Sequence, residues 1–122
     1  MAAIPPFRAT VADVGGQMAL VSVSGELDLY AKDGLHDALA SATGLRFATV
    51  VVDLSGVTFL DSTICGILVA EAKHLRRDGK NLVLVSTGNF VARVLAVAGI
   101  DQIVPVYPTL HAALQELLLK PV

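Results

Sequence analysis

One stretch, residues 50–78, limits the chain to folds in which a buried strand leads almost directly into a helix. It begins with three consecutive valines at 50–52, a β-branched run typical of a strand buried on both faces of a sheet. The run is followed by Asp61 and Ser62, which are favoured N-cap residues. Apolar residues then recur at helical spacing until Gly79, where a helix-ending glycine is expected. The stretch therefore predicts a strand, a connection and a helix, with a carboxylate and a hydroxyl at the helix N-terminus.

The start of this predicted helix is also a chemically distinct place. The free N–H groups of a first helical turn and the helix dipole favour a phosphate group there, so Ser62 is a candidate for phosphorylation. Asp-Ser-Thr before a helix is equally an ordinary cap. The tripeptide by itself does not distinguish the two roles.

Two segments, taken in order, resemble the signature of STAS domains, and most closely that of the bacterial anti-sigma factor antagonists. They are Gly25-Glu26-Leu27-Asp28 and Asp53-Leu54-Ser55-Gly56-Val57-Thr58-Phe59-Leu60-Asp61-Ser62-Thr63. The second segment joins a strand, a connection and a helix start, which makes it more specific than a tripeptide. After it, Ile64 and Cys65 stand where the family usually has glycine and leucine.

The resemblance implies a function for these residues. In the family, the serine after the aspartate is phosphorylated by a partner that is both a kinase and an anti-sigma factor. By position this serine is Ser62, with Thr63 as the second choice, and the implied partner-binding surface comprises Asp28, Asp61, Ser62 and Thr63. The unphosphorylated protein is then expected to bind the anti-sigma factor and so release a sigma factor. Phosphorylation ends this binding, and a phosphatase is a further implied partner.

The rest of the chain predicts a single α/β domain with the element order ββαβαβαβα. Apolar patterns indicate strands at 7–14, 18–24, around 50–52, 82–85 and 103–107, and helices at 31–43, 62–78, 90–98 and 110–119. Gly15-Gly16 indicates that the first two strands form an antiparallel hairpin. The later alternation indicates right-handed crossovers between parallel strands, hence a mixed sheet covered by about four helices. This order resembles the STAS fold, which we expect over 7–119 after a short tail at 1–6.

Composition and motifs argue against several classes of function. A net charge of −2 gives no electrostatic reason to expect nucleic acid or an anionic membrane as a partner. No uninterrupted apolar run reaches membrane-spanning length, no signal peptide is evident, and a single cysteine allows no internal disulfide, so we expect a cytoplasmic protein. The sequence also lacks a phosphate-binding loop, a dinucleotide fingerprint and metal-ligand spacing around its three histidines. We therefore expect no cofactor, no metal and no enzymatic activity.

Three alternatives remain open at this point. The domain could be a STAS scaffold or adaptor subunit of a signalling or transport complex, without a phosphorylation switch. It could be a small hydrolase in which His111 approaches Ser62 through space, which is the less favoured interpretation. Finally, Cys65 could be activated by the helix dipole, although a small packed core thiol is the simpler expectation.

Overall fold

The computed structural model describes residues 7–119, so the predicted tail at 1–6 lies outside the described residues. Within this part of the chain, five strands and four α-helices follow the predicted order ββαβαβαβα. Two short 3-10 helices, Leu29–Ala31 and Ile100–Gln102, are added to it. The strands are β1 (Phe7–Val14), β2 (Met18–Leu27), β3 (Thr49–Leu60), β4 (Asn81–Val85) and β5 (Val106–Tyr107); the helices are α1 (Lys32–Thr43), α2 (Ser62–Arg77), α3 (Asn89–Val97) and α4 (Leu110–Leu119).

The strands form one mixed sheet in the order β1-β2-β3-β4-β5. As predicted, β1 and β2 form an antiparallel hairpin, whereas the other three neighbouring pairs are parallel. Gly15 and Gly16 both have positive φ, as the two central residues of a tight hairpin turn require, and the Gln17 N–H closes the turn on the Val14 carbonyl. The parallel strands therefore all end at the same edge of the sheet.

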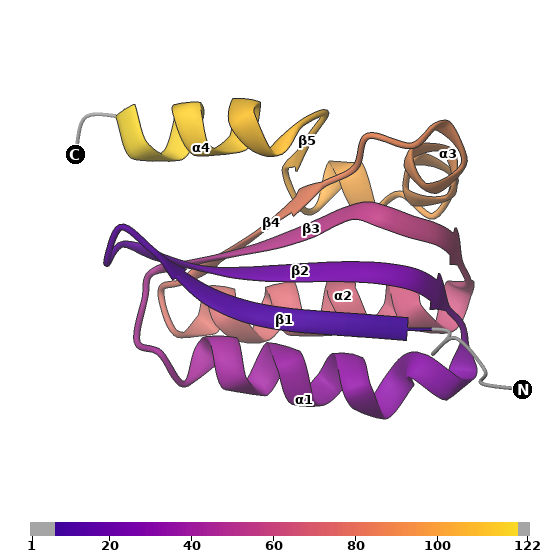
Figure 1. Ribbon diagram of the computed structural model, residues 1–122, viewed down its shortest axis with the longest axis horizontal. Coiled ribbons are helices and arrows are strands. Elements are labelled where there is room, and N and C mark those ends of the chain that lie inside the picture. The colour runs from indigo at the N-terminus through magenta and orange to yellow at the C-terminus, as the bar shows by residue number, and fades with distance from the viewer. Residues whose placement is uncertain (1–6, 120–122) are drawn as a thin grey trace, which may run out of the picture.

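Helices cover both faces of the sheet (Figure 1). α1 and α2 lie along one face, and the buried Val91 and Leu95 of α3 belong to the same core cluster, whereas α4 covers the other face. The larger core cluster lies between the sheet and α1, α2 and α3, and its fully buried members include Val21, Val52 and Leu68. A smaller cluster under α4 contains Met18, Val51, Val85 and Ala113. Because β3 contributes to both clusters, it is the doubly buried central strand that the valine run predicts.

The two strands that lead to the predicted site are longer than the sequence indicates. β2 continues through Gly25 and Glu26 to Leu27, so the prediction that this strand ends at residue 24 is wrong. β3 likewise runs on to Leu60. The pairing of β2 with β3 shifts register twice on the way, and a Cβ atom at Gly56 would lie 2.8 Å from the Ser24 Cβ. A glycine at this close approach lets the two strands stay paired up to the rim of the sheet.

The C-terminal part differs from the prediction at one strand. β5 has only two residues, Val106–Tyr107, instead of the predicted 103–107. Ile103 instead caps the 3-10 helix that precedes it, and Pro105 has no N–H to donate to a strand ladder. The following helix begins as expected, because the Thr109 hydroxyl accepts a hydrogen bond from the Ala112 N–H at 3.0 Å. Among residues 7–119, no helix combines the length and apolar character needed to cross a membrane.

Candidate functional site

The junction of β3 and α2 places Ser62 at the first position of the helix. Asp61 is the N-cap, with an extended backbone, and its Oδ1 accepts a hydrogen bond from the Ile64 N–H at 3.0 Å. This cap holds the chain so that the Ser62 and Thr63 side chains are exposed. The Ser62 hydroxyl therefore lies at the partially positive end of a helix of 16 residues.

Asp28 occupies the equivalent place on the neighbouring strand. Leu27, at the end of β2, pairs with Leu60, at the end of β3, and the Asp61 N–H donates to the Leu27 carbonyl at 3.3 Å. Asp28 and Asp61 therefore follow paired residues at the same edge of the sheet. The Asp28 Oδ1 accepts from the Tyr30 N–H at 3.0 Å and caps the 3-10 helix. We call Asp28, Asp61, Ser62 and Thr63 the rim.

Exposed apolar side chains border the rim, and no pattern in the sequence marks them as a surface. Tyr30 is 89% exposed, and Leu29 beside it is also exposed, directly after Asp28. Phe59, 40% exposed at the end of β3, stacks on Phe90 of α3, which is 52% exposed, with ring centroids 6.2 Å apart. Exposed apolar groups that gather around polar residues are typical of protein-binding surfaces. We call Leu29, Tyr30, Phe59 and Phe90 the apolar border.

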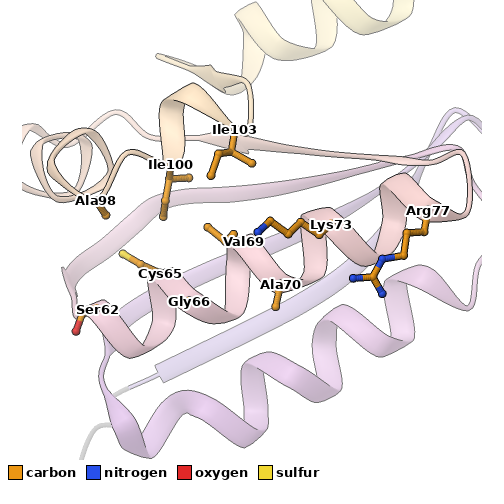
Figure 2. Close-up of a pocket in the computed structure, with 10 residues that line it drawn as sticks. All are labelled: Ser62, Cys65, Gly66, Val69, Ala70, Lys73, Arg77, Ala98, Ile100 and Ile103. Carbon is orange, nitrogen blue, oxygen red and sulfur yellow. The ribbon is translucent and has the colours of Figure 1, made fainter.

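A groove runs from Ser62 along the outer side of α2 (Figure 2). It has a volume of about 570 Å³ and separates α2 from the segment that joins α3 to β5. Ser62 lies at one end, and the side chains of Lys73 and Arg77 lie toward the other. Its remaining lining residues are Cys65, Gly66, Val69, Ala70, Ala98, Ile100 and Ile103.

Comparison with known proteins identifies the family. A family model described as the STAS domain matches residues 9–113. The chain belongs to the STAS-domain family. The anti-sigma-F factor antagonist RsfB of Mycobacterium tuberculosis is 32% identical to this STAS domain over 114 residues, which cover 93% of this chain and 92% of RsfB. The anti-sigma-B factor antagonist of Staphylococcus epidermidis is 30% identical over 86 residues, 70% of this chain and 80% of that protein.

A solved structure agrees with these sequence relationships. The crystal structure of an anti-sigma factor antagonist from Mycobacterium paratuberculosis matches this STAS domain with a TM-score of 0.82 and 33% sequence identity. The match covers 89% of this chain and 92% of that one. The family predicted from residues 25–28 and 53–63 is thereby confirmed.

The two residues that depart from the usual family sequence are both buried. Ile64 is 0% exposed and belongs to the larger core cluster, so its side chain does not project beside Ser62. Cys65 is also buried, and burial, with a further contribution from the Asp61 charge, raises the pKa of its thiol. A raised pKa keeps the thiol protonated and poorly nucleophilic, as expected of a packed core residue.

The structure does not bring His111 to Ser62. His111 is exposed at the start of α4 and lines a separate surface pocket with Leu114, Gln115 and Leu118. α4 and α2 lie on opposite sides of the sheet (Figure 1), so the rim offers Ser62 no general base of this kind. Among residues 7–119, no group of His, Cys, Asp or Glu side chains is arranged to hold a metal ion.

The cap at Asp61 leads to a prediction about stability. Replacing Asp61 with alanine removes the acceptor of the Ile64 N–H, and we expect the free energy of unfolding to fall by about 1 kcal/mol. Asp61→Asn keeps a side-chain acceptor but removes the charge, so this variant should unfold within a few tenths of a kcal/mol of wild type. Urea unfolding of the two variants measures the difference. Equal destabilisation of both would show that the charge, and not the cap, is what stabilises this helix start.

Proposed function

We propose that this STAS domain is an anti-sigma factor antagonist that acts in the cytoplasm. Its partner is an anti-sigma factor with serine kinase activity, and binding of the partner releases a sigma factor. The names of the relatives support this proposal, because two antagonists of different anti-sigma factors are 32% and 30% identical to the chain. The observation that carries it is the rim, where an exposed serine hydroxyl begins α2 directly after the Asp61 cap, at the sheet edge that also carries the Asp28 cap.

The rim and the apolar border together form a surface suited to a protein partner. Tyr30, Phe59 and Phe90 offer aromatic area that burial would stabilise, while the rim adds polar groups at its centre. Phosphorylation of Ser62 would place nearly two negative charges at that centre. These charges would lie beside Asp61 and near Asp28, and an interface that closes over them must remove them from water. Binding is therefore expected to fail once Ser62 is phosphorylated.

The fold itself should survive this modification. The phosphate would lie at the first turn of α2, where the helix dipole and the free N–H groups favour negative charge. Because the Ser62 and Thr63 side chains are exposed and Ile64 is buried, a kinase can reach the hydroxyl without displacing core residues. A phosphatase that removes the phosphate would restore binding. The switch we propose is thus a change of charge on a stable surface.

The proposal is tested by phosphorylation in vitro. A pull-down with the STAS domain first isolates a kinase-like anti-sigma factor from the host. The purified STAS domain is then incubated with this partner and ATP, and the phosphorylated residue is identified by mass spectrometry. We expect one phosphate on Ser62 of the wild type and of Thr63→Ala, and none on Ser62→Ala, which should still bind the partner. Thr63 is the matched control, because it is the neighbouring exposed hydroxyl.

Other outcomes point to other functions. A phosphate on Thr63 in the Ser62→Ala protein would move the modification to the second-choice residue. A stable complex in which neither residue is phosphorylated would support a scaffold or adaptor role without a switch. Absence of any complex with an anti-sigma factor would contradict the proposal.

A further inference from the structure

The groove along α2 presents apolar side chains to solvent on both of its sides. Val69 comes from α2, whereas Ala98, Ile100 and Ile103 come from the segment after α3 (Figure 2). Val69 and Ile103 are half-buried and Ala98 is exposed, so part of this apolar surface remains in contact with water. Covering such surface is favourable in proportion to its area.

The middle of the groove is open because two small residues lie there. Gly66 and Ala70 are both exposed and lie one turn apart on α2. A Cβ atom at Gly66 would meet nothing within 4 Å, so this space is not filled by the domain itself. Helices pack at axial distances of about 8–10 Å, and the shorter distances need small residues at the contact. The shape of the groove therefore suits a second helix.

The far end of the groove carries two cations. Lys73 and Arg77 are four residues apart on α2, and both are exposed. Within residues 7–119 neither of them forms an ion pair. The neighbouring Arg76, in contrast, donates a hydrogen bond from its guanidinium to the Ile103 carbonyl at 2.9 Å. Two unpaired cations beside an apolar groove would attract a carboxylate on whatever fills it.

The groove is also continuous with the rim, because Ser62 belongs to both. α2 rises by about 1.5 Å per residue, so the groove from Ser62 to Arg77 is roughly 22 Å long and matches about four turns of helix. From these observations we infer that the groove binds an amphipathic helix of the anti-sigma factor. The apolar face of that helix covers Val69 and Ile103, and an acidic side chain at one end pairs with Lys73 and Arg77. This inference rests on the proposed function and extends its interface beyond the rim.

The decisive variant is Gly66→Leu, which fills the open middle of the groove. Leucine has a higher helix propensity than glycine, and its Cβ atom would meet no atom within 4 Å, so the domain should be at least as stable as wild type. Affinity for the anti-sigma factor, measured by calorimetry, should fall on the order of 10- to 100-fold, because the incoming helix loses its close approach. Ala40→Leu is the matched control, because it adds a leucine at an exposed position of α1 outside the groove and should leave affinity unchanged.

The charge at the far end is tested separately. Lys73→Glu should weaken binding by roughly 10-fold, whereas Arg8→Glu, the same charge reversal on exposed β1, should have little effect. The wild-type domain serves as the reference in both tests and should bind the anti-sigma factor and be phosphorylated on Ser62. This reference tests the proposed function independently of the groove. If wild type binds and is phosphorylated but Gly66→Leu and Lys73→Glu bind equally well, the groove is not part of the interface and the inference is wrong. If wild type binds no anti-sigma factor, both are wrong.

Two other occupants would give different results. A second copy of the chain would appear as a dimer in light scattering, and Gly66→Leu would convert it to a monomer. An acyl anion would appear as added mass in native mass spectrometry of the purified protein, and Gly66→Leu would remove it. Either result would overturn the assignment of the groove to a partner helix.

Discussion

Ser62→Asp is expected to weaken binding of the anti-sigma factor by about 100-fold, which corresponds to roughly 3 kcal/mol. The new carboxylate directly follows Asp61, at the sheet edge that also carries Asp28, and both aspartates are held in place because each caps a helix. An interface that closes over three neighbouring carboxylates must desolvate like charges. Binding is measured by calorimetry with the purified partner.

The same substitution should leave the fold intact. An acidic residue in the first turn of α2 interacts favourably with the helix dipole, so the melting temperature should stay the same or rise slightly. Ser62→Asn is the matched control, because asparagine has nearly the size and shape of aspartate without its charge. We expect this control to bind within a few-fold of wild type. If Asn weakens binding as much as Asp, size and not charge disrupts the interface, and the electrostatic account of the switch is wrong.

Ile64→Gly, which introduces the residue that the family usually has at this position, is expected to lower the free energy of unfolding by about 3–5 kcal/mol. Ile64 is fully buried in the core cluster between the sheet and α1 and α2, so its removal leaves a cavity under the first turn of α2. Glycine adds a further cost of about 1 kcal/mol in a helix. Urea unfolding, with the slope of the transition checked for two-state behaviour, measures the loss.

Thr63→Gly separates the cost of the cavity from the cost of glycine in a helix. Thr63 precedes Ile64 in the same helical turn but is exposed, so its replacement carries the glycine cost without the cavity. We expect a loss below about 1 kcal/mol for this control. Similar losses at the two positions would mean that Ile64 contributes little to packing. In that case the chain would have no structural reason to depart from the usual family sequence there.

The sequence predicted the parts of the fold that depend on local chemistry. The valine run, the Gly15-Gly16 turn and the helical spacing after Ser62 each depend on neighbouring residues, and all three lie where they were expected. The cap at Asp61 was likewise predictable, since an N-cap bonds to a residue three positions later in its own chain. The family, in contrast, was identified from its resemblance in the two signature segments, residues 25–28 and 53–63.

What the sequence did not reveal depends on contacts between distant segments. β2 continues to Leu27 because it stays paired with β3 across two shifts of register. The apolar pattern of either segment alone does not predict that pairing. The stacking of Phe59 on Phe90 joins the end of β3 to α3, so neither residue appears special in its own segment. The groove along α2 also needs the segment after α3 as its second wall. The phosphorylation site could thus be proposed from the sequence, but the surface around it could not.

The helix caps formed by Asp28 and Asp61 affect the rate of partner binding and the conformational entropy that binding loses. Each carboxylate belongs to the proposed partner-binding surface and also holds the start of a helix, so this part of the surface is ordered before any partner binds. A preorganised surface loses little conformational entropy on association, and its encounter rate is not limited by a folding step. The same arrangement limits how these positions can change in evolution. Replacement of either aspartate by a residue without a side-chain acceptor also removes a cap. New specificity is therefore more easily acquired at Tyr30 or Phe90, where no backbone hydrogen bond depends on the side chain.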